Sequence, residues 1–217
     1  MRTLIFDLGG VVLRWDPYAA FAGVAPRDEV DRFFTDVNWR DWNLQQDAGR
    51  SWDEAEALLA AEHPRWAHLA GTYRANYDLV IPGEIDGTGP LLAELAASGV
   101  RLLALTNWSG DLFRRTRPRF PVLQHFEGIV VSGDERLVKP DPVIFRLLCA
   151  RYAVDPAEAI FVDDTEKNVI GAREFGLHAI HFTGASALRD ELSRLGVAPS
   201  PARVGQRAGH IIRARRH

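Results

Sequence analysis

Short apolar runs alternate with longer segments along this chain. Five such runs lie at residues 3–6, 100–105, 128–131, 159–162 and 178–182. Between them, apolar residues recur every three or four positions, which is the period of an amphipathic helix. Short runs without polar alternation are typical of strands that are buried on both faces of a sheet. The alternation therefore predicts an α/β fold with a mostly parallel sheet.

The first two runs are separated by almost a hundred residues, far more than a crossover helix needs. Helical periodicity covers residues 27–36, 39–46 and 66–77, and the capping box Ser51-Trp52-Asp53-Glu54 opens a further helix between them. We therefore predict an inserted helical domain at residues 17–80, called the cap below. The core would comprise residues 1–16 and 81–198.

Two kinds of local signal mark helix ends in the core. Asp141 followed by Pro142 is typical of an N-cap with proline at the first helical position. Gly99 and Gly176 stand where a left-handed residue would end a helix.

Composition and charge narrow the function classes. The 217 residues are 47% hydrophobic, with a formal net charge of −3 and a pI near 6.2, so nucleic acid is not an expected partner. No apolar stretch reaches the roughly 20 residues of a membrane span, and no signal-peptide pattern opens the chain. We expect no membrane partner and a cytoplasmic location. The single cysteine, Cys149, excludes an intrachain disulfide and fits a packed helical thiol. Residues 199–217 are basic, and we expect a solvated, flexible tail there.

Polar clusters follow three of the apolar runs, and a lysine precedes a predicted helix. The clusters are Asp7 after the first run, Thr106-Asn107 after the second and Asp163-Asp164 after the fourth, and the lysine is Lys139. The carboxyl ends of parallel strands meet at one edge of a sheet, where open α/β folds bind ligands. The sequence thus predicts that three carboxylates, a hydroxyl and an ammonium group meet at one site.

Taken in order, these fragments resemble the motifs of the haloacid dehalogenase superfamily, most of whose members are magnesium-dependent phosphatases. The fragments are Phe6-Asp7-Leu8-Gly9-Gly10-Val11, Leu105-Thr106-Asn107, Lys139-Pro140-Asp141-Pro142 and Phe161-Val162-Asp163-Asp164-Thr165. The resemblance implies a Rossmann-like parallel core with a helical cap of the first cap class, Mg²⁺ as cofactor and a small phosphorylated metabolite as substrate.

The resemblance also implies a role for each motif residue. Asp7 would be the nucleophile and a Mg²⁺ ligand, with further metal ligands from Asp164 and the backbone carbonyl of Gly9. Asp163 would orient a bound water or support Asp164, and Asn168 would brace the same loop. Three residues would bind or neutralise the phosphate, namely Thr106, Asn107 and Lys139. Only two lysines occur in the chain, Lys139 and Lys167, which makes a lysine at this position more informative.

One residue departs from the family pattern. The nucleophile is usually followed two positions later by a second Asp that acts as general acid and base, and here that residue is Gly9. General acid or base help is typically worth about 10² to 10⁴ in rate. Three outcomes are open. Another group could act as the acid and base, and Asp16 is the nearest candidate, although an N-cap is its ordinary role. Alternatively, the substrate has a good leaving group, or turnover is poor.

The pattern Asp-Leu-Gly-x-Val at residues 7–11 resembles a sub-branch of the superfamily. That branch is similar to bacterial α-glucose-1-phosphate phosphatase and to the phosphatase domain of soluble epoxide hydrolases. Hydrolysis of a small phosphomonoester is therefore the favoured hypothesis, with a sugar 1-phosphate as the expected substrate class.

Three rival functions stay open. A 2-haloacid dehalogenase shares the fold and the nucleophile but needs no metal, and the carboxylates of Asp163 and Asp164 argue against it because they would repel Asp7 without a cation. A phosphate-binding or regulatory module would explain Gly9. A phosphomutase would need a replacement base, for which His125, His178 and His181 could be offered.

The cap would select the substrate. Four tryptophans lie in it, and each could line a pocket, although packing within the cap is the ordinary role: Trp39, Trp42, Trp52 and Trp66. The same aromatic surface could pair with a second copy of the chain, so a homo-oligomer is one open alternative.

Overall fold

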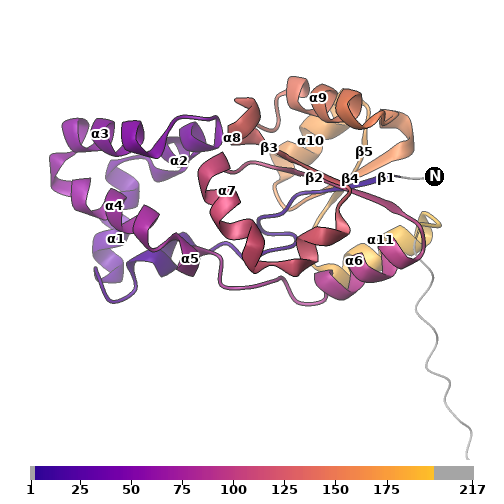
Figure 1. The fold of residues 1–217 in the computed structure, drawn as a ribbon, viewed down its shortest axis with the longest axis horizontal. Coiled ribbons are helices and arrows are strands. Elements are labelled where there is room, and N and C mark those ends of the chain that lie inside the picture. The colour runs from indigo at the N-terminus through magenta and orange to yellow at the C-terminus, as the bar shows by residue number, and fades with distance from the viewer. Residues whose placement is uncertain (1–2, 198–217) are drawn as a thin grey trace, which may run out of the picture.

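The computed structural model describes residues 3–197, which form a parallel sheet layered between helices with a helical lobe to one side (Figure 1). Five strands build the sheet in the order β3-β2-β1-β4-β5. They are β1 (Thr3–Phe6), β2 (Arg101–Thr106), β3 (Gly128–Val131), β4 (Ala159–Asp163) and β5 (His178–His181). Every pair of neighbouring strands is parallel. The predicted α/β class and parallel sheet are confirmed.

Helices cover both faces of the sheet because each strand buries alternate residues on opposite sides (Figure 1). Leu4 and Phe6 pack with the apolar cluster under α6 (Thr88–Ala97) and α11 (Ala185–Arg194). Ile5, one position between them, packs with the cluster under α9 (Pro142–Tyr152) and α10 (Glu166–Phe175). Burial on both faces accounts for the unbroken apolar runs in the sequence.

The predicted helix ends in the core have the expected geometry. The Asp141 side chain accepts a hydrogen bond from the Val143 amide at 2.8 Å at the start of α9. Gly99 and Gly176 have φ values of 77° and 107°, in the left-handed region. Cys149 is buried within α9, as expected for a packed thiol. The shorter core helices are α7 (Gly110–Thr116), η3 (Arg117–Arg119), η4 (Pro121–His125), α8 (Ser132–Glu135) and η5 (Pro156–Glu158).

The segment between β1 and α6 forms the helical lobe at the left of Figure 1. Its elements are η1 (Pro17–Phe21), α1 (Arg27–Asp36), α2 (Trp39–Asp47), α3 (Trp52–Glu62), η2 (Pro64–Trp66), α4 (Ala67–Ala75) and α5 (Tyr77–Val80). An aromatic cluster fills it, in which the Trp39 ring lies 4.6 Å from Tyr73 and 5.4 Å from Phe33, centroid to centroid. The boundaries at 16/17 and 80/81 stay predictions, although this segment is helical as expected.

One predicted cap helix differs in the structure. The sequence pattern predicts a single helix over residues 66–77, whereas α4 ends at Ala75 and α5 begins at Tyr77. Asn76 has φ −95° and ψ 17°, and its side-chain amide donates a hydrogen bond to the Ala20 carbonyl at 2.8 Å. This tertiary bond to η1 turns the chain where periodicity alone would continue it.

Two segments join the cap to the core, and they run side by side. The Arg14 amide donates to the Gly83 carbonyl at 2.8 Å, and the Asp16 amide donates to the Val80 carbonyl at 2.9 Å. Leu13 and Glu84 form an antiparallel bridge next to them.

Two expectations about the chain as a whole can be placed on this fold. Within residues 3–197, no helix combines the length and the apolar character that crossing a bilayer requires. The expected flexible tail at residues 199–217 lies outside the described residues.

Candidate active site

Three neighbouring strands of the sheet end at the same place and bring together the residues that the motifs single out. Asp7 directly follows β1, Thr106 is the last residue of β2, and Asp163 is the last residue of β4, with Asp164 next to it. Carboxylate oxygens of Asp7, Asp163 and Asp164 lie within 4.8 Å of one another. The order β2-β1-β4 explains this convergence of residues far apart in the sequence.

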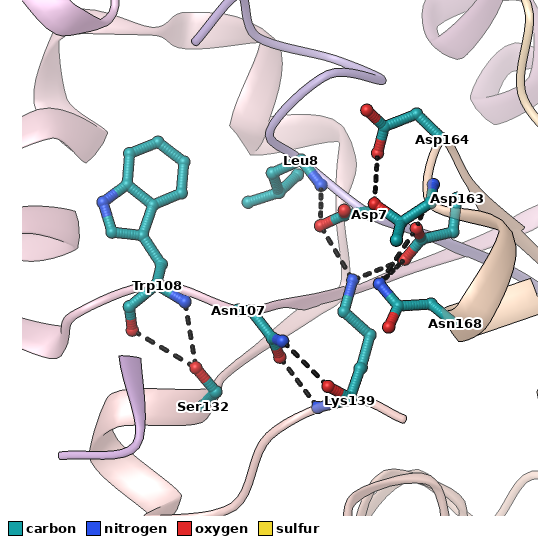
Figure 2. A network of polar contacts seen from close by, with 10 residues as sticks. Asp7, Leu8, Asn107, Trp108, Ser132, Lys139, Asp163, Asp164 and Asn168 are labelled. Carbon is teal, nitrogen blue, oxygen red and sulfur yellow. Dashed lines mark hydrogen bonds and ion pairs between the residues drawn. The ribbon is translucent and has the colours of Figure 1, made fainter. Parts of the chain in front are cut away.

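Lys139 holds two of these carboxylates. Its Nζ lies 2.6 Å from Asp163 Oδ2 and 3.0 Å from Asp7 Oδ1, and its side chain is fully buried (Figure 2). The Asn107 side chain fixes the backbone of Lys139 in both directions: Nδ2 donates to the Lys139 carbonyl at 3.1 Å, and Oδ1 accepts from the Lys139 amide at 2.8 Å. Asn107, expected to donate to phosphate, is thus engaged in positioning the lysine loop.

Asp163 is an anchor within the core. Besides Lys139, it accepts hydrogen bonds from the Thr165 amide at 2.8 Å and from Asn168 Nδ2 at 3.1 and 3.2 Å (Figure 2). Asn168 therefore braces the loop after β4, consistent with its expected role. Asp164 is instead exposed, so its oxygens are accessible to a ligand.

Burial and charge oppose each other in this cluster. Burial raises the pKa of Asp7 to about 7, while the charge of Lys139 lowers it and that of Asp163 raises it again. Burial alone would lower the pKa of Lys139, but the charges of Asp163 and Asp7 outweigh it and raise that pKa above its ordinary value. Burial and the charge of Asp163 also raise the pKa of Asp164. A nearby cation would reverse the shift at Asp7 and Asp164 because it favours the charged carboxylates.

The two glycines after Asp7 have different surroundings. Gly10 has φ +79°, and a Cβ atom there would lie 2.2 Å from Asp164 Oδ2, so only glycine lets this carboxylate approach the backbone. At Gly9 a Cβ atom would meet nothing within 4 Å. The position of the missing acid and base therefore has room for a side chain.

A cavity of about 380 Å³ lies between the core and the cap at this site. Asp7, Gly9, Thr106 and Asp164 are among the residues of its core wall, and the cap contributes Trp39, Asp47 and Tyr77. A more open hollow of about 320 Å³ lies by β5 and α11 and contains none of the motif residues. We assign the site to the first cavity because two of the three clustered carboxylates, Asp7 and Asp164, line it.

Several residues of this cavity have no signal in the sequence motifs. The cavity is also lined by Trp15, Asp47, Tyr77 and Trp108. Of these, only Trp108 lies next to a motif residue, Asn107. Burial raises the pKa of Asp47 to about 7, an unusual environment that the sequence does not reveal. Of the four cap tryptophans, Trp39 lines the cavity, whereas the Trp66 indole is buried and donates to Asp36 at 2.9 Å.

The replacement bases considered from the sequence lie elsewhere. Asp16 is exposed, and its side chain accepts from the Tyr18 amide at 3.0 Å as the N-cap of η1. His181 Nε2 lies 2.8 Å from the Asp164 backbone carbonyl, which braces the loop after β4. His178 faces the other hollow, and His125 lines neither.

The donor set fits a hard divalent cation. Three carboxylates and one ammonium group leave a formal excess of two negative charges among Asp7, Asp163, Asp164 and Lys139. Oxygen ligands of this kind are those that Mg²⁺ prefers. Because Asp163 is already saturated by Lys139, Thr165 and Asn168, the oxygens best placed to bind the cation belong to Asp7 and Asp164.

A family model described as haloacid dehalogenase-like hydrolase matches residues 1–176, which span the cap and all motif residues. The chain belongs to this family. The resemblance inferred from the motifs is thereby confirmed for the superfamily; the sub-branch stays a prediction.

Phosphatases and a dehalogenase are among the proteins similar to this hydrolase. A sesquiterpene phosphatase from Aspergillus oryzae is 28% identical over 195 residues, covering 89% of this chain and 96% of that protein. A family enzyme from Bacteroides thetaiotaomicron, solved in complex with magnesium and inorganic phosphate, superposes with a TM-score of 0.67 at 20% identity over 85% of this chain and 95% of that one. L-2-haloacid dehalogenase from Xanthobacter autotrophicus gives 0.63 at 21% identity over 92% and 85%. At these identities the two structures show a shared Rossmann-like fold.

Proposed function

We propose that this hydrolase is a Mg²⁺-dependent phosphomonoesterase that works through an aspartyl-phosphate on Asp7. The observation that carries the proposal is the cluster of Asp7, Asp163 and Asp164 around the buried ammonium group of Lys139. Such an excess of negative charge suits a site that binds a cation together with a phosphate dianion.

Each residue then has a role that follows from its place. A Mg²⁺ ion held by Asp7, Asp164 and the Gly9 carbonyl would neutralise phosphate charge during attack. Lys139 holds Asp7 Oδ1 at 3.0 Å, which orients the carboxylate and leaves its other oxygen to attack phosphorus. Thr106 lies at the cavity edge of β2 and would donate to a phosphate oxygen. Asn107 would support phosphate binding through the lysine loop that it positions.

The pair Asp163 and Asp164 distinguishes this proposal from dehalogenation. An enzyme that attacks carbon on an uncharged chloroalkyl group gains nothing from three clustered carboxylates, whose repulsion would only raise the pKa of its nucleophile. A relative that matches 89% of this chain, from Aspergillus oryzae, is named as a sesquiterpene phosphatase, which supports the proposal.

For the substrate class, a sugar 1-phosphate is the first candidate, on the Asp-Leu-Gly-x-Val pattern at residues 7–11. A phosphate ester of an apolar alcohol is the second candidate, favoured by the aromatic lining from Trp15, Trp39, Tyr77 and Trp108. The similarity to a sesquiterpene phosphatase extends over the cap and supports this second candidate. We propose small-molecule phosphate esters as the partners, and a cytoplasmic location without nucleic-acid or membrane partners.

The first experiment measures phosphate release from α-glucose 1-phosphate and farnesyl phosphate, with Mg²⁺ and with EDTA. We expect Mg²⁺-dependent release from at least one of them, and Asp7→Asn to lower the rate by at least about 10³-fold because it removes the nucleophile. Phosphate release that Asp7→Asn leaves unchanged would refute the proposal. Halide release from 2-chloropropionate in EDTA would assign the chain to dehalogenation instead.

A further inference from the structure

Asp47 is the last residue of α2 and brings a carboxyl group from the cap to the cavity that Asp7 and Gly9 line from the core. No sequence motif includes it, and the proposed mechanism so far gives it no role. It lines the same cavity as Gly9, the position at which this hydrolase lacks the general acid and base.

We propose that Asp47 is the general acid and base of the reaction, supplied by the cap in place of the side chain that Gly9 lacks. The inference rests on the proposed phosphatase function and deepens it, because it names the group that exchanges protons with the leaving oxygen and with water.

The core fixes the loop that carries Asp47. The Ser132 hydroxyl donates a hydrogen bond to the Asp47 backbone carbonyl at 2.6 Å, and it accepts one from the Trp108 amide at 2.9 Å. Gly49, with φ +96°, lies so close to α8 that a Cβ atom would be 2.9 Å from the Gly133 carbonyl. A catalytic side chain needs this kind of support, because a displacement of about 1 Å can cost about 10²-fold in rate.

The carboxyl group of Asp47 has two amide donors. Its Oδ2 accepts a hydrogen bond from Asn43 Nδ2 at 3.2 Å. Burial raises the pKa of Asp47 to about 7, and a hydrogen bond from the Ser109 backbone and the charge of Lys139 lower it in part. An acid with a pKa near neutrality can both give and take a proton at neutral pH.

Several titratable groups face Asp47. Tyr73 of α4 and Tyr77 of α5 are buried beside it, and both have pKa values raised far above the ordinary range, so they stay neutral. Lys139 on the core side is held by Asp7 and Asp163. Asp41, on the cavity wall one turn and a half earlier in α2, is exposed and accepts from Asn38 Nδ2 at 2.6 Å. Of the two carboxyl groups on the cap wall, Asp47 is thus the partly buried one.

The proton and electron balance closes with Asp47 in this role. In the first step an oxygen of Asp7 attacks phosphorus, the bond from phosphorus to the ester oxygen breaks with its electron pair going to that oxygen, and the Asp47 carboxyl gives it a proton. In the second step the Asp47 carboxylate takes a proton from water as the water oxygen attacks phosphorus. The bond to Asp7 then breaks, which releases phosphate and restores both side chains.

Exchange of ¹⁸O between labelled inorganic phosphate and water tests this inference without knowledge of the substrate. Asp7 attacks phosphate and expels water, which needs the same acid, and the reverse step needs the same base. With Mg²⁺ present, we expect Asp47→Asn to slow the exchange by about 10² to 10⁴-fold. Affinity for phosphate with Mg²⁺, measured by calorimetry, should change by no more than about threefold because Asn has the size of Asp and keeps one side-chain oxygen as an acceptor.

Two further variants sharpen the readout. Asp53→Asn is the matched cap control, because Asp53 is exposed and outside the cavity, and it should exchange at the wild-type rate. Gly9→Asp in the Asp47→Asn background should recover at least about tenfold of the exchange, because the space at Gly9 admits a side chain that can act as the acid.

The outcomes separate this inference from the proposed function. Exchange in wild type that Asp47→Asn leaves intact would overturn the role of Asp47 and leave the phosphatase proposal standing, as would a loss seen with Asp41→Asn instead. Parallel loss of phosphate binding in Asp47→Asn would make the residue structural, and no recovery with Gly9→Asp would refute the shared role. Wild-type protein that binds phosphate but never exchanges its oxygen would refute the proposed function itself.

Discussion

The two walls of the cavity hold their carboxyl groups in different ways. On the core wall, Asp7 and Asp163 share the buried ammonium group of Lys139 at 3.0 and 2.6 Å. On the cap wall, Asp47 has the Asn43 amide and the Ser109 backbone as donors, and among residues 3–197 no ion pair includes it. Burial raises the pKa of Asp7 and of Asp47 alike to about 7, but only the core wall adds an ammonium group in direct contact and carboxylate oxygens that could bind a cation, which would favour the charged form there.

This difference gives the two walls separate chemistry. The proposed nucleophile, Asp7, must be ionised to attack, and Lys139 together with a bound cation would keep it in that state. The proposed general acid must carry a proton at neutral pH, and burial without an ion pair raises the pKa of Asp47 toward that range. Two aspartates in one cavity can thus act as nucleophile and as general acid because their surroundings differ.

The largest expected effect comes from removing the ammonium group of Lys139 from the core wall. Lys139→Met leaves Asp7 and Asp163 buried without their partner, and we expect it to lower the free energy of unfolding by about 3 to 5 kcal/mol. Chemical denaturation measures the change. Lys167→Met is the control, because Lys167 is exposed and should alter stability by no more than about 0.5 kcal/mol. Equal stability of the two variants would show that the core wall does not depend on its ion pairs.

A smaller effect is expected from adding one methyl group to the core wall. Gly10→Ala places Cβ 2.2 Å from Asp164 Oδ2 at φ +79°, so we expect a loss of about 2 kcal/mol in unfolding free energy and weaker Mg²⁺ binding. Gly9→Ala, with nothing within 4 Å, should stay within about 0.5 kcal/mol of wild type. Denaturation and Mg²⁺ titration of both variants check this contrast, which equal affinities would contradict.

The smallest effect concerns the cap wall and depends on pH. Burial raises the pKa of Asp47 from 3.8 to about 7, so the folded state binds this proton more tightly than the unfolded chain does. Wild type therefore loses stability from this group as the pH rises from about 4 to about 7. The Asn side chain of Asp47→Asn does not titrate, so we expect the variant to unfold with a free energy about 1 kcal/mol higher than wild type at pH 8. The expected gain is this small because Asp47 is partly accessible to solvent.

Thermal unfolding of both proteins at pH 5 and pH 8 measures this gain. The variant should gain less at pH 5, where wild-type Asp47 is already protonated. A gain that is the same at both pH values would show that the carboxyl of the cap wall does not titrate in this range.

The core wall could be predicted from the sequence because its residues are placed by the sheet. Asp7, Thr106 and Asp163 each stand at the end of an apolar run, and parallel strands put those ends together. Lys139 stands out as one of only two lysines, next to a helix start that Asp141 and Pro142 mark. The engagement of Asn107 with the lysine backbone was not foreseeable, because its loop partner lies 32 residues away.

The cap wall could not be predicted in the same way. Asp47 ends an ordinary amphipathic helix, and its burial depends on how the cap rests on the core through contacts such as Ser132 with the Asp47 carbonyl. Trp15 and Trp108 line the cavity for the same reason, since tertiary placement and not local pattern brings them there. The break at Asn76 likewise depends on a bond to Ala20 that no local signal reveals.

The paired segments that join cap and core have a consequence for how such a chain can vary. Residues 13–16 and 80–84 are hydrogen-bonded to each other, so the two linkers between the cap and the core lie side by side. We expect that the cap between these linkers can be lengthened, shortened or exchanged without altering the strand order or the register of β1, because the two linkers already contact each other. The proposed acid and base, Asp47, and the side chains that would select the substrate would then vary together as one replaceable unit.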